Sequence, residues 1–166
     1  MWRLICAGLV LASVIPTSTA IADDDERADV VAVMDKAYAA ILSGKPEDWQ
    51  GVVLPAGNVL SFRPRPDGEP GELEMRMETN EAQTSGDHSG GPELVERWTG
   101  EPTVMIRGPI ATIWGDYDFW IDGAFSHCGG TSVTLAKVDG NWTIANWMWT
   151  VEKENCPTDP ANDLLR

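Results

Sequence analysis

The stretch that most constrains the fold is residues 110–152, close to the C-terminal end of the chain. Two Asp-Gly pairs, Asp122-Gly123 and Asp139-Gly140, divide it into three segments in which apolar and polar residues alternate. Asp-Gly between such segments favours a two-residue type I′ turn, because both turn residues need a positive φ. The pattern therefore predicts three consecutive antiparallel strands. Five of the eight tryptophans also lie here, so we expect any binding site to be built on these strands.

Residues 1–22 have the three regions of a secretory signal peptide. Arg3 supplies a positive start, residues 4–15 form an apolar run too short to span a bilayer, and residues 20–22 read Ala-Ile-Ala. We expect cleavage after Ala22 and a secreted or periplasmic protein, with a single domain over residues 23–156 and a polar tail over 157–166. The alternative is an N-terminal anchor that is not cleaved.

The charge of the chain excludes one class of partner. The formal net charge is −14, and removal of residues 1–22 makes it one unit more negative because Arg3 is the only charged residue there. Proteins that bind polyanions have the opposite balance. We therefore expect no nucleic-acid partner and, after cleavage, no membrane partner.

Two cysteines would remain after cleavage, Cys128 and Cys156. An even number of cysteines in an exported protein favours a disulfide bond. Counting from the turns places Cys128 opposite Val151, five residues before Cys156, so this bond requires the tail to fold back. The alternative is two separate buried thiols.

The N-terminal part of the chain predicts helices. Residues 23–43 have acidic residues in the first turn and one apolar face, formed by Val30, Met34, Ala37, Tyr38, Ile41 and Leu42. A second, short helix is expected from Pro46 to about Gly57, because proline is favoured in a first helical turn.

Strand patterns follow the helices. Strands are expected over residues 58–63, 73–78 and 103–107, with a glycine-rich loop or lid over 79–92 and a helical turn or strand over 93–98. Helices followed by a run of strands indicate an α+β domain. A long sheet facing one helical layer must curl, and the hollow between them is the natural place for a pocket.

The strand sequences resemble the nuclear transport factor 2-like superfamily, and within it the SnoaL-like branch, which includes proteins labelled as lumazine-binding. The resemblance implies a cone-shaped α+β fold, often dimeric through the sheet. Members include isomerases, cyclases, dehydratases and proteins that only bind a ligand. The residues that carry it are Val104 to Phe119, Asp122-Gly123, Phe125-Ser126-His127-Cys128-Gly129, Asp139 to Ile144, and Glu152 to Cys156.

Counting back from the first turn places Asp118 directly opposite His127. Opposed Cβ atoms are about 4.5–5.5 Å apart, within reach of a carboxylate–imidazole hydrogen bond. A carboxylate in this position orients the ring and raises its basicity, so His127 is a candidate general base and Asp118 its partner. The alternative is a structural hydrogen bond at the rim, and one β-bulge would place the two residues on different faces.

The same counting sorts the other strand residues onto two faces. We expect the face that carries His127 to bind a small, partly apolar molecule together with one helix residue. The opposite face is strongly aromatic and predicts a homodimer interface. The expected ligand-binding residues are Tyr38, Trp114, Trp120, Thr131, Asn146 and Met148. The expected interface residues are Tyr117, Phe119, Ile121, Trp147, Trp149 and Val151.

Other candidates are less specific. Arg63 and Arg65 flank Pro64 and are either a clamp for an anionic ligand or solvated charges. His88 follows Asp87, but no histidine or cysteine pair has a metal-ligand spacing, so we expect no metal. No phosphate-binding or dinucleotide-binding glycine motif is present, and we expect no cofactor.

The sequence thus predicts an exported protein that binds a small ligand. Whether it is an enzyme stays open. The alternatives are a proton-transfer enzyme that uses His127 and Asp118, of the isomerase, cyclase or dehydratase type, and a dimeric interaction module without catalysis.

Overall fold

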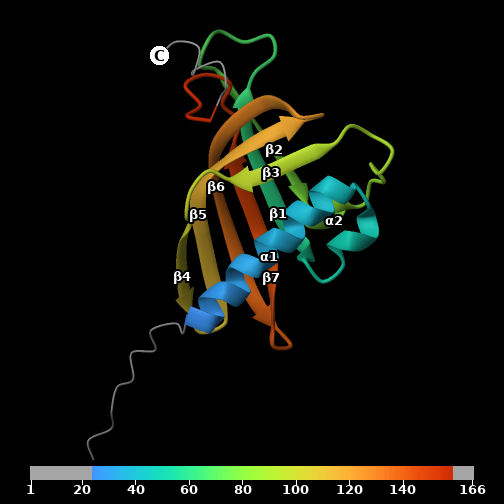
Figure 1. Ribbon diagram of the computed structural model, residues 1–166, viewed down its shortest axis with the longest axis vertical. Helices are drawn as coiled ribbons and strands as arrows, with labels where there is room; N and C mark the ends of the chain where they lie inside the picture. The colour runs from blue at the N-terminus through green and yellow to red at the C-terminus, as the bar shows by residue number, and fades with distance from the viewer. Residues whose placement is uncertain (1–23, 159–166) are drawn as a thin grey trace, which may run out of the picture.

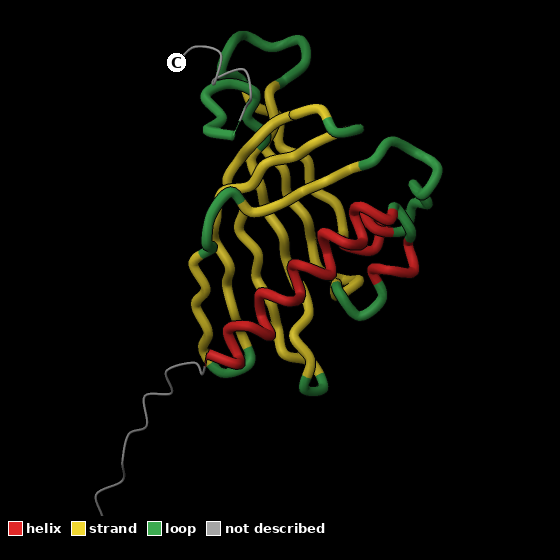
Figure 2. The backbone as a smooth tube through the Cα atoms, viewed as in Figure 1, coloured by secondary structure: helices red, strands yellow, loops and turns green. Residues whose placement is uncertain are grey.

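The computed structural model describes residues 24–158. A long helix lies diagonally across one face of a curved seven-stranded sheet (Figures 1 and 2). This is the expected α+β fold. In chain order the elements are α1 (Asp24–Ser43), the 3-10 helix η1 (Pro46–Trp49), β1 (Val53–Pro64), β2 (Leu73–Thr79), α2 (Asn80–Thr84), β3 (Leu94–Trp98), β4 (Thr103–Arg107), β5 (Ile110–Ile121), β6 (Ala124–Val138) and β7 (Asn141–Thr150).

The strands lie in the order β2-β1-β7-β6-β5-β3, and β4 also pairs with β5. The short strands β3 and β4 share one edge of β5, with β3 near its end at Ile121 and β4 near its start at Ile110. All pairs are antiparallel except β1 with β7, which are parallel. A parallel pair is possible there because residues 65–140 separate the two strands, so no hairpin sets their direction.

Both predicted hairpin turns are present. The φ angles are 50° at Asp122 and 74° at Gly123, and 49° at Asp139 and 85° at Gly140. Positive φ at both central residues is what a type I′ turn requires. The three strands that were expected from residues 110–152 are β5, β6 and β7.

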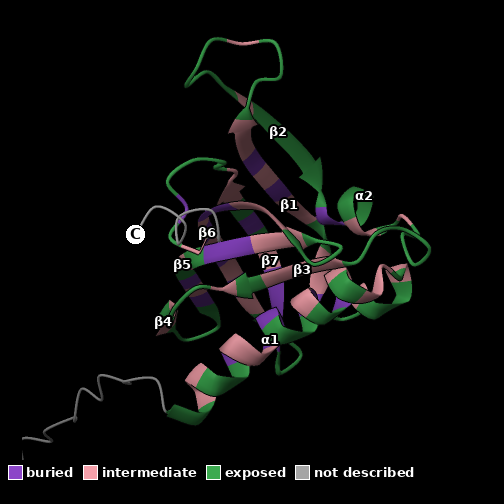
Figure 3. Ribbon diagram, turned by 45° about the horizontal axis from the view of Figure 1, so that its top comes forward, coloured by how far each residue is buried: buried purple, intermediate pink, exposed green. Residues whose placement is uncertain are grey.

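Helix α1 covers the concave face of the sheet with its apolar side. Val30, Met34 and Ala37 are fully buried, as the helical pattern predicts. Leu42 was also expected on this side but is 52% exposed. Twelve residues carry the helix about 120° past a whole number of turns, so Leu42 lies at the edge of the apolar stripe that Val30 begins. Figure 3 colours the buried stretches of the chain purple. The buried partners on the sheet include Ala111, Ile113, Val133, Leu135, Trp142, Ile144 and Trp147.

The expected second helix is wrong beyond Trp49. The helical segment ends at Trp49, and β1 already begins at Val53, which pairs with Ile144 of β7. Gly57 lies in this strand rather than at a helix end. A Cβ atom at Gly57 would overlap the carbonyl group of Ala145, so the close approach of β1 and β7 explains the glycine.

The segment expected as a loop over 79–92 contains α2. Thr79 caps this helix through its side chain, which accepts a hydrogen bond from the N–H of Ala82. The chain after α2 is tied to the end of α1, because the N–H of His88 donates to the carbonyl of Gly44 at 2.7 Å. Residues 93–98, which were ambiguous, contain β3.

Cys128 and Cys156 are joined by a disulfide bond, in agreement with the pairing considered from the sequence. Cys128 forms an antiparallel bridge with Glu152, not with Val151. Asn155 then adopts a φ of 60°, which turns the chain back toward β6. The tail therefore folds back as the bond requires.

The signal peptide proposed for residues 1–22 lies outside the described residues, as does most of the polar tail over 157–166. Between residues 24 and 158, no helix is long and apolar enough to cross a membrane.

Candidate functional site

A bulge in the first hairpin separates Asp118 from His127. The pairing shifts by one residue at Ser126, between Trp120–Phe125 and Phe119–His127. Asp118 therefore lies opposite Cys128, and the predicted Asp118–His127 pair is wrong. Successive strand residues point to opposite faces, so one extra residue moves His127 to the other side of the sheet.

Asp118 has a different partner. Its two carboxylate oxygens accept hydrogen bonds from Arg97 of the neighbouring strand β3, at 2.8 and 3.1 Å. The guanidinium group of Arg97 also lies over the ring of Trp120, 5.1 Å from its centroid. These three residues belong to the convex side of the sheet. Asp118 is thus the buried half of an ion pair rather than a partner of the imidazole.

A second bulge, at Ala145, moves the side chains of β7 beyond it to the opposite side of the sheet from the one expected. The pairing shifts between Leu135–Ile144 and Thr134–Asn146. Asn146 and Met148, which were expected in the site, point to the convex side and are exposed. Trp147 and Trp149 point to the concave side instead. The aromatic face that was interpreted as a dimer interface is therefore largely the interior of the cone.

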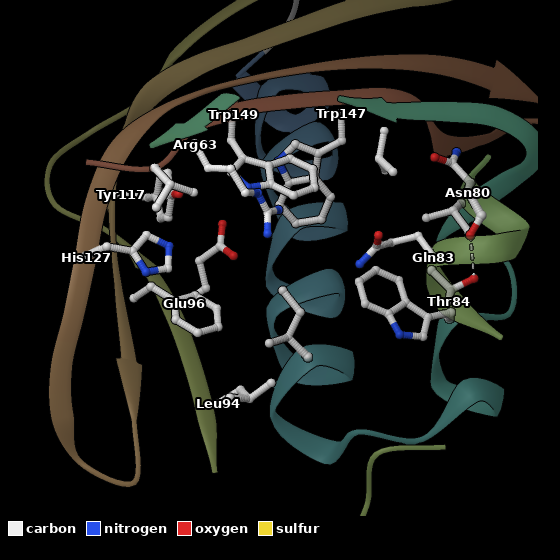
Figure 4. A pocket seen from close by; sticks show the side chains of 16 residues that line it. Arg63, Asn80, Gln83, Thr84, Leu94, Glu96, Tyr117, His127, Trp147 and Trp149 are labelled. Carbon is white, nitrogen blue, oxygen red and sulfur yellow. Dashed lines mark hydrogen bonds between the residues drawn. The ribbon is translucent and has the colours of Figure 1, made fainter. Parts of the chain in front are cut away.

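A pocket of about 310 Å³ opens between the sheet and the helices (Figure 4). Its walls are mostly aromatic and aliphatic, with a few polar side chains. Arg63, Glu96 and His127 lie toward one end, and Asn80, Gln83 and Thr84 lie toward the other (Figure 4). The lining residues are Ile41, Trp49, Val53, Val59, Arg63, Asn80, Gln83, Thr84, Leu94, Glu96, Tyr117, Phe119, His127, Trp147, Trp149 and Val151.

The aromatic wall is fixed by hydrogen bonds behind it. The indole N–H of Trp147 donates to Oγ1 of the fully buried Thr131 at 2.8 Å. Trp149 packs edge-on against Trp147, with ring centroids 6.0 Å apart. The hydroxyl of Tyr117 donates to the carbonyl of Thr150 at 2.7 Å. Side chains held in this way form a preformed surface for a planar, apolar molecule.

His127 enters the pocket from β6. Its ring stacks on Phe119 with centroids 4.9 Å apart, and its Nδ1 lies 3.0 Å from Oγ of Ser126. Burial, together with the positive charges of Arg63 and Lys153, lowers the pKa of His127 to about 4. The imidazole is therefore neutral near neutral pH and can accept a proton or a hydrogen bond.

Glu96 enters the pocket from β3, and its carboxyl group points into the pocket (Figure 4). Burial raises its pKa to about 8. A carboxyl group with this pKa carries a proton near neutral pH and can donate a hydrogen bond. Glu96 was not among the site residues expected from the sequence, although an acidic residue between Leu94 and Trp98 on one face of a short apolar strand was a usable signal.

The two arginines near Pro64 have different environments. Arg63 lines the pocket, whereas Arg65 is exposed and lies 4.0 Å from a carboxylate oxygen of Glu72. Only Arg63 is placed to meet a ligand in this cavity.

The six expected ligand-binding residues do not line the pocket. Tyr38 and Thr131 lie behind its wall, where both contact Trp147. Trp114 is 54% exposed on the convex side. The other three are Trp120, Asn146 and Met148, which the two bulges and the strand alternation also direct away from the pocket.

Metal binding has no support in the described part of the chain. Between residues 24 and 158, no three histidine, cysteine or acidic side chains come close enough together to hold an ion. Near neutral pH the pocket offers one cation, a neutral imidazole, a protonated carboxyl group and aromatic walls. This set can bind a planar molecule and can exchange protons with it.

Comparison with known proteins identifies the fold. No protein-family model matches the chain, and no curated protein matches it. A Salmonella enterica serovar Typhimurium protein of the nuclear transport factor 2-like superfamily is 14% identical, with 80% of this chain and 94% of that chain covered at a TM-score of 0.59. A Novosphingobium aromaticivorans protein, described as NTF2-like with a cystatin-like fold, is 14% identical, with 86% and 90% covered at 0.58.

A Nostoc punctiforme protein of unknown function with a cystatin-like fold is 9% identical, with 84% and 97% covered at a TM-score of 0.58. At these identities the likeness concerns the fold. The chain has the nuclear transport factor 2-like fold that the strand sequences led us to expect.

Proposed function

We propose that this protein binds a small, partly apolar molecule in the aromatic pocket. The observation that carries the proposal is the wall formed by Trp147, Trp149, Tyr117 and Phe119 around a cavity of about 310 Å³. Ligand pockets in proteins run from about 300 to 1,000 Å³, so the cavity suits a ligand of one or two rings. The resemblance to the SnoaL-like, lumazine-binding branch supports the same type of ligand.

The proposal is tested by a thermal-shift screen of small aromatic compounds, with native mass spectrometry of the hits. We expect at least one compound to raise the unfolding temperature of the wild type. Trp149→Ala should weaken binding about tenfold or more, because a stacking surface is lost. Trp114→Ala is the matched control and should bind as the wild type does. Equal weakening by both variants would argue against this pocket.

A second candidate function is proton transfer on the bound ligand. It is favoured by the presence of Glu96 and His127 in one cavity, with pKa values shifted in opposite directions. Glu96 would act as the acid and His127 as the acceptor near neutral pH. The test is deuterium incorporation next to the carbonyl group of bound ketones in D₂O. Exchange no faster than in buffer, or unaffected by Glu96→Gln and His127→Gln, would count against catalysis.

We also propose a homodimer through the sheet, now through its convex face. Met77, Leu60, Met148 and Trp114 lie along one row across the strands, and all but Leu60 are largely exposed. Exposed apolar rows of this kind are typical of interfaces. Sedimentation of the wild type and Trp114→Asp tests this: a monomeric wild type, or a dimer that the variant does not weaken, would refute it.

Export remains our proposal for the N-terminal segment. The disulfide between Cys128 and Cys156 supports it, because such bonds persist in oxidising compartments. N-terminal sequencing of the protein recovered from a cell envelope fraction and medium should begin at Asp23. A protein that keeps residues 1–22 would contradict cleavage after Ala22.

A further inference from the structure

Arg63 is a cation in the pocket wall that no carboxylate of the described chain neutralises. None of the ion pairs among residues 24–158 includes it. One terminal nitrogen donates to Oγ of Ser61 at 2.8 Å, which fixes the guanidinium group. Its Nε is buried and has no hydrogen-bond partner among the described residues. The chain has 26 acidic residues, so an arginine left unpaired inside an apolar cavity indicates a partner that the chain does not supply.

The other titratable groups of the pocket leave this charge in place. Glu96 carries a proton near neutral pH because burial raises its pKa to about 8. His127 is neutral because burial and Arg63 itself hold its pKa near 4. Tyr117 is also neutral, since burial raises its pKa. The pocket therefore has a net positive charge near neutral pH, although the protein as a whole is strongly negative.

The position of Arg63 defines where an anion would lie. A smaller cavity of about 190 Å³, lined in part by Ser61, Arg76 and the acidic Glu78, adjoins the pocket. Arg63 and Trp149 line both cavities. A ligand that fits this arrangement has an anionic group at the junction and a flat apolar body against the tryptophans. A planar carboxylate suits a guanidinium group because two parallel N–H···O bonds can form.

We propose that the pocket takes a small aromatic monocarboxylate, whose carboxylate is bound by Arg63 and whose ring lies against Trp149. This assignment rests on the proposed ligand-binding function and specifies its ligand class. The protonated carboxyl of Glu96 can donate a further hydrogen bond to the bound anion, and the uncharged His127 does not compete for it.

The test is isothermal titration calorimetry at pH 6.5 with two probes of the same shape, 1-naphthoate and 1-naphthamide. The wild type should bind 1-naphthoate about tenfold or more tightly than 1-naphthamide. Arg63→Met should abolish this preference and change the affinity for 1-naphthamide by less than about threefold. Arg63→Lys keeps the charge and should retain part of the preference. Arg65→Met removes the neighbouring exposed arginine and should behave as the wild type does.

The outcomes distinguish the carboxylate assignment from the proposed binding of an aromatic ligand. If 1-naphthamide binds the wild type as tightly as 1-naphthoate, the carboxylate assignment is overturned while ligand binding in the pocket stands. A preference for 1-naphthoate that persists in Arg63→Met also overturns it. If neither probe binds the wild type at millimolar concentration, both the assignment and the proposed aromatic pocket are overturned. The wild-type comparison needs no variant, so it is decisive even if Arg63→Met fails to fold.

Discussion

The wild type is expected to lose stability as the pH rises from 6.5 to 8, and replacement of Glu96 by glutamine should remove this loss. Burial raises the pKa of Glu96 to about 8 in the folded protein, against 4.5 for an exposed glutamate. Between these values the folded state holds a proton that the unfolded state has released. The free energy of unfolding contributed by this group therefore falls as the pH rises toward 8.

His127 has the opposite effect at lower pH. Its pKa is about 4 in the folded state and 6.5 when exposed, so its contribution rises with pH up to about 6.5 and is constant above that value. Of these two groups, only Glu96 therefore changes the free energy of unfolding between pH 6.5 and pH 8. This interval spans about 1.5 pH units, which corresponds to about 2 kcal/mol at ~1.36 kcal/mol per unit. Glu96 is only half-buried, so solvent screens its charge in part and about 2 kcal/mol is an upper value.

The assay is urea unfolding at pH 6.5 and pH 8.0, followed by tryptophan fluorescence. The stability of Glu96→Gln relative to the wild type should increase by up to about 2 kcal/mol between the two pH values. Glu93→Gln, at an exposed carboxylate close by in the chain, should show no such increase. If the free energies of unfolding of the wild type and Glu96→Gln change equally between the two pH values, Glu96 is ionised in the folded protein. This result would contradict the protonated carboxyl group assigned to the pocket.

Three further substitutions test the packing around the site by the same unfolding assay. Thr131→Val should lower the free energy of unfolding by about 1–3 kcal/mol, because it leaves the buried indole N–H of Trp147 without an acceptor. An unchanged urea midpoint would show that this hydrogen bond does not hold the aromatic wall in place. Gly57→Ala should cost about 1–3 kcal/mol because its Cβ would overlap the backbone of β7, and a neutral effect would contradict the close pairing of β1 and β7. Replacement of Cys128 and Cys156 by serine should cost about 3.6 kcal/mol for a separation of 28 residues, and no loss would indicate that the bond is not formed.

The hairpins could be predicted from the sequence because their turns carry a strong local signal. The pairs next to the turns, Ile121 with Ala124 and Val138 with Asn141, follow directly from the Asp-Gly positions. The order of elements and the helical face of α1 follow from hydrophobic periodicity in the same way.

The site could not be predicted because two bulges reverse the faces of the strands. The extra residues, Ser126 and Ala145, are ordinary strand residues, and neither provides a glycine that would mark a bulge. Beyond each bulge every side chain changes sides. This is why His127, which lines the pocket, was given Asp118 as a partner, and why Trp147 was placed outside.

The most direct test of the pocket is fluorine NMR of protein labelled with 5-fluorotryptophan and titrated with 1-naphthoate. Signals can be assigned through single tryptophan-to-phenylalanine variants. We predict that the Trp147 and Trp149 resonances shift in proportion to bound ligand, whereas those of Trp114 and Trp120 on the convex side remain unchanged. Shifts at Trp114 or Trp120, with Trp147 and Trp149 unaffected, would contradict ligand binding in the cone.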